Sequence, residues 1–546
     1  MHSSIGLITL NARFIHSSLS LRYLRNAARN AGYANTWIRE FIINQPLWKI
    51  AAEVLRANPD ILGVSIYIWN RQKSLELIEL LQKQKPDLQV VVGGPEVSFD
   101  ETPPTGCTLI AGEGEAKWVE YLNIAAQGAL PSQETLDRWK TFGTDLPELI
   151  APYLEEDLPD LQNRYAYLET SRGCPYLCSF CLSALDEKVR YFDEDVVRGQ
   201  ITMLIDAGIK KFKFVDRTFN LNPKRMKRLI GWLSQFTDRE FHFEVVGDIL
   251  SDDMLDFLSA VPHGVFQFEI GIQTLNEDIN QRMDRRQDNA RLFAAISRLI
   301  AEHRIQIHCD LILGLAGETL DVALNSFEQV LKLRPHELQL GFLKFLPGAP
   351  INRLIKDYDY RYLSTPPYEV IASRDMTAEE ILFLKSLDET FDLFYNSKRF
   401  RYSLDNLLLS MDPVSVFKKL LQALQSRGHL SDGVSLDNQY RIFSNTFAIE
   451  QQSHSRDLLK LDYLYNQRTF RLPTFMQEEE WSLPGPGRST WEKDRKTPIV
   501  PFEHAITAED AGFRLTPSST PVYYAIAHST GRSGYFVRPE IHPVPA

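Results

Sequence analysis

The chain of 546 residues contains 44% hydrophobic and 24% charged residues, which is the composition of a globular protein rather than a disordered one. Its length exceeds what one ordinary core accommodates and predicts several domains. The formal net charge of −11 is spread along the chain without a basic stripe, which argues against a nucleic-acid partner. No apolar run reaches the roughly 20 residues that span a bilayer, and the N-terminus shows no secretory signal. We therefore expect a cytoplasmic protein without membrane segments.

The first 128 residues alternate short apolar strands with amphipathic helices. Strands are expected at 5–10, 61–68, 89–92 and 107–111, and helices at 19–31, 47–57, 74–84 and from about 116 onward. Strands that are apolar throughout predict a parallel sheet covered on both faces. The fold class is therefore α/β, beginning with a doubly wound, Rossmann-like domain whose ligands bind beyond the carboxyl ends of the strands.

Residues 129–163 are rich in proline and acidic residues, and we interpret them as an interdomain linker on the surface. A second alternating series fills residues 164–350. Its strands are expected at 166–169, 211–216, 241–246, 265–270, 305–313 and 337–344. A complete eight-stranded barrel takes about 250 residues. Six β/α units in a shorter segment predict a partial, open (β/α)6 barrel.

The alternation is lost over residues 351–546, which we expect to form a mostly helical or irregular accessory region. Helices are predicted at 377–395 and 413–427, and the last 70 residues show no clear period. The aromatic side chains of this region suit either a chamber that covers the substrate or an ordinary core.

Three cysteines lie within eight residues, directly after the first predicted strand of the barrel. They are Cys174, Cys178 and Cys181, whereas Cys107 and Cys309 stand alone in apolar surroundings and are expected to be small buried hydrophobes. A clustered set does not suit a disulfide framework. Thiolates are ligands of iron–sulfur clusters, and three ligands leave one iron of a four-iron cluster open. A structural zinc site would need a fourth ligand, and none is close in sequence.

The cysteine stretch resembles the radical S-adenosylmethionine (SAM) superfamily, whose motif is Cys-x3-Cys-x2-Cys with an aromatic residue before the last cysteine. Phe180 occupies that place. The resemblance implies that Cys174, Cys178 and Cys181 hold a 4Fe-4S cluster and that SAM chelates its open iron. It further implies that an electron from the cluster cleaves SAM to a 5′-deoxyadenosyl radical.

Two later segments are similar to SAM-contacting segments of the same superfamily. Residues 269–274 resemble its Gly-x-Gln-Ser/Thr segment, which assigns Glu269, Gly271 and Gln273 to the cofactor. Residues 310–319 resemble Gly-Leu-Pro-Gly-Glu-Thr, with alanine in the place of proline, which assigns Gly314.

The chain departs from the superfamily after the second barrel strand, where Gly-Gly-Glu is absent. Residues 215–220 stand there instead, and Asp216 is our candidate to accept from the methionine ammonium group of SAM. Asn220 is a second candidate acceptor, and a helix-capping role for Asn220 or Asn222 is an equal alternative. Arg217 also fits a surface ion pair.

A doubly wound domain ahead of such a barrel resembles the cobalamin-binding subgroup of the superfamily. The matching loops are Gly93-Gly94-Pro95-Glu96 and Gly112-Glu113-Gly114-Glu115, because glycine lets a backbone approach a bulky ligand. The resemblance implies cobalamin contacts from Gly93, Gly94, Glu96, Gly112 and Gly114. A dinucleotide is disfavoured because the first strand is not followed by Gly-x-Gly-x-x-Gly.

Two further residues of this domain keep alternative interpretations. The Asp-x-His-x-x-Gly motif of other cobalamin proteins is absent, so we interpret His16 as a hydrogen-bonded loop histidine rather than a cobalt ligand. Trp69 either covers the corrin or fills a domain interface.

Together these features imply a cobalamin-dependent radical SAM enzyme with a 4Fe-4S cluster, SAM and cobalamin as cofactors. The expected reaction is methylation of an unactivated carbon in a small-molecule or peptide substrate, with flavodoxin or ferredoxin as electron donor. Cyclisation or rearrangement without methyl transfer and a non-catalytic cluster-binding sensor are the alternatives. A tRNA-modifying enzyme would predict a basic accessory domain, which the C-terminal region lacks. The sequence singles out neither a substrate nor a catalytic side chain.

Overall fold

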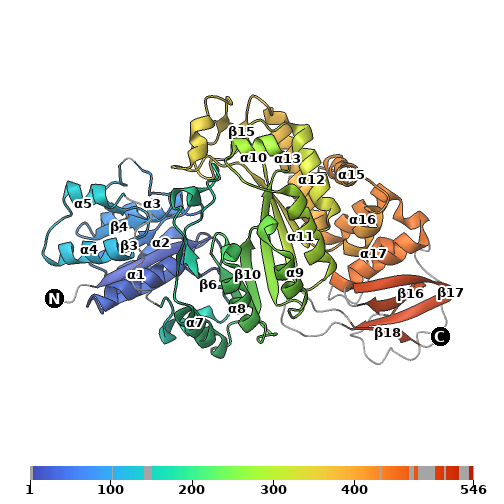
Figure 1. Ribbon diagram of the computed structural model, residues 1–546, viewed down its shortest axis with the longest axis horizontal. Coiled ribbons are helices and arrows are strands. Elements are labelled where there is room, and N and C mark those ends of the chain that lie inside the picture. Colours follow the sequence, from blue (N-terminus) through green and yellow to red (C-terminus); the bar gives the residue numbers. More distant parts are fainter. Residues whose placement is uncertain are drawn as a thin grey trace. The chain divides into compact units, whose positions relative to one another are not determined.

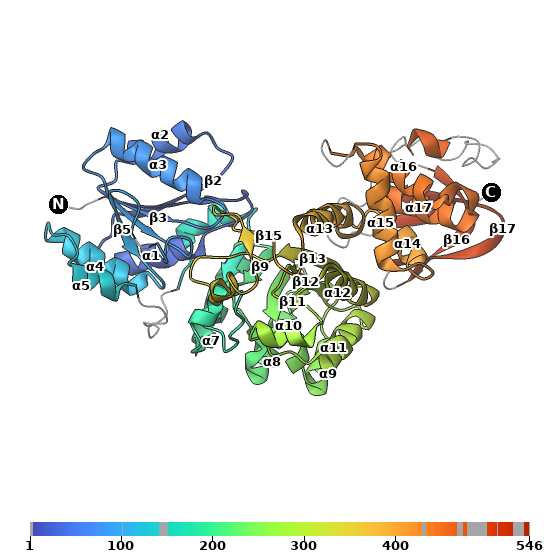
Figure 2. The ribbon, with the colours of Figure 1, turned by 90° about the horizontal axis from the view of Figure 1, so that it is seen from above.

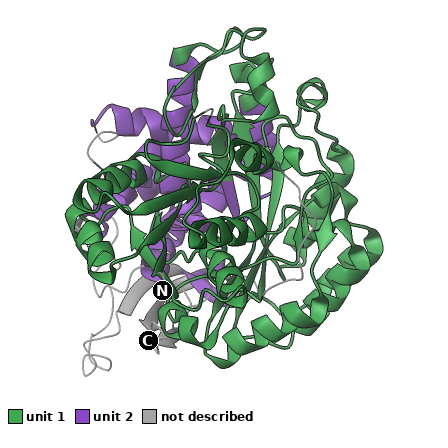
Figure 3. Ribbon diagram, turned by 90° about the vertical axis from the view of Figure 1, so that its left-hand side faces the viewer, with its two compact units in different colours: residues 1–323, 339–378 green, residues 324–338, 379–546 purple. Residues whose placement is uncertain are grey.

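The computed structural model describes residues 4–100, 102–140, 151–428, 433–466, 473–477, 499–509, 512–527 and 540–544. The chain forms two compact units (Figure 3). The first contains residues 1–323 and 339–378, and the second contains residues 324–338 and 379–546. Each helix within the described ranges is too short or too polar to cross a lipid bilayer.

The first unit begins with a five-stranded parallel sheet in the order β2-β1-β3-β4-β5. The strands are β1 (Ile5–Asn11), β2 (Thr36–Ile42), β3 (Ile61–Ser65), β4 (Gln89–Gly93) and β5 (Cys107–Ile110). Helices α1 (Leu19–Asn30) and α4 (Glu115–Ala126) cover one face, and α2 (Leu47–Ala57) and α3 (Arg71–Gln84) the other (Figure 2). This arrangement confirms the predicted doubly wound sheet.

The sequence does not predict β2, because the prediction rests on strands that are apolar throughout. β2 lies at the edge of the sheet. Its sequence, Thr-Trp-Ile-Arg-Glu-Phe-Ile, includes charged residues, and most of its side chains are only partly buried. An edge strand has one neighbour and one solvated side, so it does not need the continuous apolar sequence of a central strand.

The same unit continues with a six-stranded sheet in the order β13-β12-β11-β10-β9-β6, and its pairings from β6 to β12 are parallel. The strands are β6 (Ala166–Leu168), β9 (Lys211–Phe214), β10 (Glu240–Val245), β11 (Phe266–Gln273), β12 (Gln306–Leu313) and β13 (Glu337–Phe342). Helices α7 (Glu194–Asp206), α8 (Pro223–Leu233), α9 (Asp252–Ser259) and α11 (Asn289–Ala301) lie between successive strands (Figure 1). Consecutive order in one open sheet confirms the partial barrel.

Barrel strand β10 alternates two kinds of side chain. Phe241 and Phe243 are completely buried and stack on phenylalanines of neighbouring strands, whereas Glu240, His242 and Glu244 occupy the alternate positions. Because successive side chains of a strand point to opposite faces, the second set lies on the other face of the sheet. The concave face of this barrel is therefore polar, unlike the usual interior of valine, isoleucine and leucine.

The connection between the sheets includes α5 (Gln133–Arg138), η1 (Glu155–Asp157) and α6 (Leu158–Leu161). Trp139 and Tyr153 are each 1% exposed, and the Asp157 carboxylate receives two 2.7 Å hydrogen bonds from Arg25. The predicted surface position is wrong for these side chains. Their apolar and ion-pairing atoms attach the connection to α1, which proline content alone does not reveal.

The second unit is built around aromatic packing between α13 (Ala378–Phe391), α14 (Arg401–Leu407), α15 (Pro413–Gln425), α16 (Leu436–Phe447) and α17 (Ser453–Asn466). Phe391, for example, packs edge-on against Phe327 and Phe417. The described part also contains an antiparallel sheet of β16 (Ile499–Glu509), β17 (Gly512–Ala527) and β18 (Glu540–Val544). The sequence does not predict this sheet, because each of its three strands contains proline, which is uncommon within strands.

We predict that Gly94→Ala destabilises the first unit strongly. Gly94 has a φ of +108°, and a Cβ there would overlap the Ile66 carbonyl oxygen. The free energy of unfolding should fall by about 1–2 kcal/mol from backbone strain and by about 1–3 kcal/mol more from the steric overlap. Gly128→Ala is the matched control, because Gly128 has a φ of +70° but open space around it, so only the strain applies. Equal losses in denaturant unfolding of the two variants would contradict the prediction.

Candidate functional site

The cysteine loop is closed at its base by a small antiparallel pair, β7 (Ser171–Arg172) and β8 (Arg190–Tyr191). Gly173 follows β7 with a φ of +89°, and a Cβ at this position would overlap the Lys188 carbonyl oxygen. The Cys174 amide donates to Asp186 O at 2.8 Å. Only glycine permits this close crossing immediately before the first cysteine.

Three cysteines on this loop have free thiols, and each sulfur lies near a hydrogen-bonding group. Cys174 Sγ is 3.7 Å from Thr218 Oγ1, and Cys178 Sγ accepts from Arg285 Nη1 at 3.7 Å. Cys181 Sγ accepts from the Ser183 amide at 3.4 Å. Burial raises the pKa of Cys178, and the nearby Arg285 charge opposes that shift. Soft sulfur ligands with hydrogen-bond donors around them fit an iron–sulfur cluster.

The middle of the loop is held by Ser179, which is completely buried. Its amide donates to Met283 O at 2.9 Å, its hydroxyl donates to Asp284 at 2.6 Å, and its carbonyl accepts from the Ile351 amide at 2.7 Å. Phe180, predicted to contact the cofactor, is half-buried next to this anchor. These contacts fix the chain between Cys178 and Cys181.

Asp216 is 1% exposed and holds the start of the loop. Its carboxylate accepts from Thr170 N at 2.8 Å, Thr170 Oγ1 at 2.7 Å and Ser171 Oγ at 2.6 Å. Burial raises its pKa against these hydrogen bonds. A contact with the SAM ammonium group stays a prediction. Of the two asparagines considered as caps, Asn222 caps α8, whereas Asn220 exchanges two hydrogen bonds with the backbone of Val246.

The end of β11 has the irregular backbone that suits a ligand contact. The register between β11 and β12 shifts between Gly271 and Gln273, and Gln273 has a φ of +67°. Its Oε1 atom is buried without a hydrogen-bond partner among the described residues. A strained residue with an orphaned acceptor fits the predicted contact with SAM. The carboxylate of Glu269 is turned to His242 instead, at 3.0 Å.

Gly314 lies at the end of β12 with a φ of +86°, and Glu318 folds back onto it. Glu318 is 1% exposed, and its Oε2 accepts from the Gly314 amide at 2.7 Å. Burial raises the pKa of Glu318 to about 8, although the two backbone hydrogen bonds lower it. The Glu318 carboxyl thus fixes the loop that we predict to contact SAM.

A pocket of about 920 Å³ lies between the amino-terminal sheet and the barrel. Its lining includes Gly93, Gly94, Gly112 and Gly114, four of the five residues predicted for cobalamin. From the barrel side it is lined by Tyr167, Glu169, Arg172, Leu182, Leu185, Asp186, Val215 and Arg217. This volume is at the upper end for a ligand pocket, so it suits a large cofactor that reaches the cysteine loop.

The remaining pocket walls are aromatic and hydrogen-bonded. The rings of Tyr67 and Trp69 stack with centroids 4.6 Å apart. His16 Nδ1 lies 2.7 Å from the Tyr167 hydroxyl, which is the hydrogen-bonded loop histidine expected from the sequence. Glu96, the fifth predicted cobalamin contact, is buried and accepts from the Tyr368 hydroxyl, outside this lining.

Two ion pairs connect the segment between β5 and the first turn of α4 to the base of the cysteine loop. Arg172 Nη2 lies 2.7 Å from Glu115, and Arg190 Nη2 lies 2.7 Å from Glu113. These four side chains are between 7% and 17% exposed. Burial lowers the pKa of Arg172, but the charges of Glu169 and Glu115 outweigh it and raise that pKa. We call these four residues the domain clamp.

Sequence reasoning missed Arg285, the clamp partners and a pair of barrel histidines. Arg285 is separated from Cys178 by more than a hundred residues, and nothing local indicates their contact. His242 and His308 carry one available signal, because each lies in a strand whose alternate residues are ionisable.

We predict that Glu318→Gln changes the pH dependence of thermal stability. The carboxyl pKa rises from 4.5 to about 8 on folding, so its contribution is fully present below pH 4.5 and is lost as pH rises toward 8. Glutamine does not titrate. The unfolding midpoint of the variant relative to the wild type should therefore increase by a few degrees between pH 5 and pH 8. A difference that stays constant over this range would contradict the prediction.

Three family models match the chain. One described as the B12 binding domain matches residues 5–122, and one described as the Radical SAM superfamily matches residues 168–330. The third, Protein of unknown function (DUF4080), matches residues 356–486. The first two confirm the expected cofactor chemistry of cobalamin and SAM, and the radical SAM match implies the 4Fe-4S cluster.

The chain is 26% identical to the cobalamin-dependent radical SAM methyltransferase TokK of Streptomyces tokunonensis, over 59% of this chain and 52% of TokK. It spans about half the length of the curated relatives it matches.

The fold is similar to two solved structures. OxsB, a cobalamin-dependent SAM radical enzyme solved with aqua-cobalamin and SAM, gives a TM-score of 0.54 at 15% identity, over 84% of this chain and 74% of that one. TsrM of Kitasatospora setae, a radical SAM methyltransferase solved with cobalamin and a [4Fe-4S] cluster, gives 0.53 at 14% identity, over 67% and 78%. Along this one chain, the match to the B12 binding domain precedes the match to the Radical SAM superfamily, in the order that the sequence predicted.

Proposed function

We propose that this protein is a cobalamin-dependent radical SAM methyltransferase that acts on an unactivated carbon. The observation that carries the proposal is the single pocket lined both by the glycine loops Gly93–Gly94 and Gly112–Gly114 and by Leu182 and Leu185 next to Cys181. A methyl carrier and a radical source must both reach one substrate, and a pocket lined from both sides supports this proposal.

In this proposal Cys174, Cys178 and Cys181 hold the cluster, and Gly271, Gln273 and Gly314 contact SAM. When bound, the cluster and SAM supply a carbon radical, and cobalamin supplies the methyl group. The protein itself contributes position. Arg285 donates to Cys178 Sγ and so supports the charge of a thiolate ligand. Asp216 fixes the start of the loop and Ser179 its middle, so the three sulfurs are presented from a rigid backbone.

The substrate and the reductant are further parts of the proposal. A pocket with the polar groups Tyr167, Glu169 and Arg217 suits a small-molecule or peptide substrate with polar substituents. Two relatives support methyl transfer, because both TokK and 2-(S-pantetheinyl)-carbapenam-3-carboxylate methyltransferase are named as methyltransferases. A flavodoxin or ferredoxin is the proposed electron donor.

The proposed function predicts that Cys178→Ala abolishes 5′-deoxyadenosine formation. The protein is reconstituted without oxygen with iron, sulfide and cobalamin, then incubated with SAM and a strong reductant. Wild-type protein should hold a four-iron cluster and release deoxyadenosine, and the variant should lose both because one iron has no thiolate. Cys107→Ser is the matched control, since Cys107 lies on β5 away from the loop, and it should retain both.

The products separate the alternatives. Methyl transfer through cobalamin consumes a second SAM and yields S-adenosylhomocysteine, so both nucleosides should accumulate. Deoxyadenosine without S-adenosylhomocysteine would support cyclisation or rearrangement instead. A wild-type protein that binds the cluster and SAM but releases neither product would leave a non-catalytic sensor as the better explanation.

The proposed function also predicts that Gly114→Leu weakens cobalamin binding while the iron–sulfur cluster remains bound. Gly114 lines the pocket and has a φ of −98°, which any side chain adopts, so leucine fills the pocket without backbone strain. We expect at least about a tenfold loss of affinity, which corresponds to 1.4 kcal/mol. Gly199→Leu, at an exposed position of α7 with open space around it, is the control. Equal cobalamin binding by both variants would refute this assignment of the pocket.

A further inference from the structure

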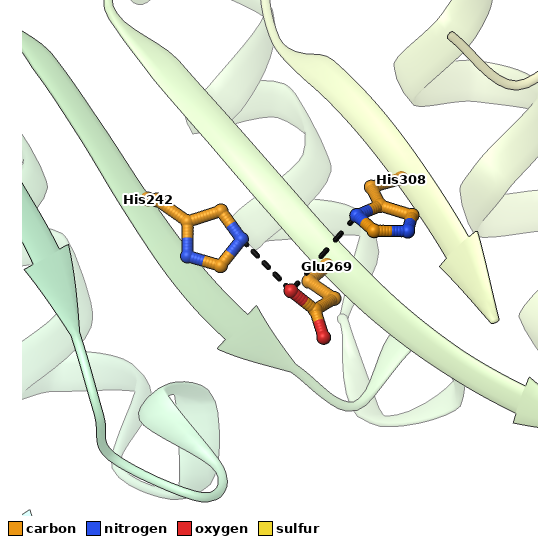
Figure 4. A group of neighbouring side chains, drawn as sticks. All are labelled: His242, Glu269 and His308. Carbon is orange, nitrogen blue, oxygen red and sulfur yellow. Dashed lines mark ion pairs between the residues drawn. The ribbon is translucent and has the colours of Figure 1, made fainter. Parts of the chain in front are cut away.

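The polar face of the barrel contains a compact group of three side chains from neighbouring strands. His242 lies on β10, Glu269 on β11 and His308 on β12 (Figure 4). In the sheet register Glu269 pairs with His308, and Glu269 also pairs with Glu244, two residues beyond His242. Glu269 therefore lies opposite His308, and His242 lies two residues before the register partner of Glu269, on the same face of the sheet. One ligand atom of each residue lies within 4.8 Å of the others.

Both histidines are 8% exposed, so their rings are separated from bulk water. His242 Nε2 is 3.0 Å from Glu269 Oε2, and His308 Nδ1 is 3.9 Å from the same oxygen. In Figure 4 the two rings approach this carboxylate from opposite sides. A hydrogen bond explains the first distance, whereas the second is longer than a hydrogen bond.

The spacing and the surroundings are those of a metal site. Ligand atoms about 2.0–2.2 Å from a tetrahedral zinc ion are roughly 3.3–3.5 Å apart, and the two observed distances lie on either side of this value. The other nitrogen of His308, Nε2, is 3.2 Å from Asp310 Oδ1, which is an ion-pair distance without hydrogen-bond geometry. A carboxylate behind a histidine commonly orients that histidine toward a metal. His242 Nδ1 is buried without a hydrogen-bond partner among the described residues, so this ring is not held by a competing contact.

We propose that His242, Glu269 and His308 bind a divalent transition-metal ion inside the barrel, separate from the cysteine loop. Two imidazoles and one carboxylate suit zinc or ferrous iron, whereas magnesium and calcium prefer oxygen ligands throughout. Three protein ligands leave a coordination position for water or for an oxygen or nitrogen of a substrate. Asp310 lies behind His308. Positive charge near the carboxylates of Glu244, Glu269 and Asp310 comes from Lys213, which pairs with His242 in the register, and from Arg217, whose Nη1 is 3.9 Å from Glu244.

The test measures zinc binding by the full-length chain in which Cys174, Cys178 and Cys181 are replaced by alanine, so that the cysteine loop offers no sulfur ligands. After dialysis, we expect one bound Zn²⁺ per chain by elemental analysis, and a visible absorption spectrum of a nitrogen- and oxygen-ligated ion when Co²⁺ replaces it. Failure of the proposed methyltransferase reaction leaves this result unaffected, because neither SAM nor cobalamin is present.

Variants in the same background locate the ion. His242→Gln and His308→Gln retain much of the side-chain volume and should lose more than about 100-fold in zinc affinity, whereas Asp310→Asn should lose roughly 10–100-fold. His303→Asn is the matched histidine control, because His303 is exposed and its φ of +51° suits asparagine. It should bind zinc as its parent does. Circular dichroism establishes which variants are folded.

Two outcomes would overturn the proposal. One is a folded cysteine-free chain that binds no zinc in a saturable manner, and the other is unchanged affinity in a folded His308→Gln or Asp310→Asn variant. Should the cysteine-free chain not fold, the same substitutions are compared in the otherwise unaltered chain with its cluster assembled. In that comparison, the parent chain with its iron–sulfur cluster must also bind zinc, and His308→Gln must lose this zinc. Any other result would show that the site does not exist.

Discussion

The domain clamp is the interaction on which the rest of the first unit depends. Arg172 and Arg190 stand at the two ends of the cysteine loop. Glu113 lies on the loop after β5, and Glu115 is the first residue of α4. Each arginine also pairs with a carboxylate on its own side, Arg172 with Glu169 and Arg190 with Asp186, so its guanidinium group is held from both sides. The clamp therefore fixes the distance between the predicted cobalamin loop and the predicted cluster loop.

The barrel combines a stable apolar core with polar groups on its other face. Its strands place phenylalanines such as Phe241 and Phe243 on the helix-covered face, where they stack and are completely buried. The opposite face is thereby free to hold ionisable residues, including His242 and Glu269. Hydrophobic burial on one side thus stabilises the sheet, and the chemistry on the other side does not have to.

The order of elements was predictable wherever local pattern decides structure. The apolar strands and the glycine-ended helices of both α/β domains follow from periodicity, and the cysteine spacing identified the loop from Cys174 to Cys181. Prediction failed where the environment overrides the pattern. Edge strand β2 is polar because it has one neighbour, and the strands from residue 499 onward are interrupted by proline.

By itself, the sequence determined which residues can bind a metal or a cofactor, and in which β/α unit each of them lies. It could do so because the periods of strands and helices and the spacing of ligands are local properties of the chain. Only the tertiary structure decided which of them meet. Arg285 reaches Cys178, Glu96 turns to Tyr368, and His242 lies 3.0 Å from Glu269 because neighbouring parallel strands bring distant residues together on one face. Such contacts depend on the register and curvature of a whole sheet, and no short segment encodes them.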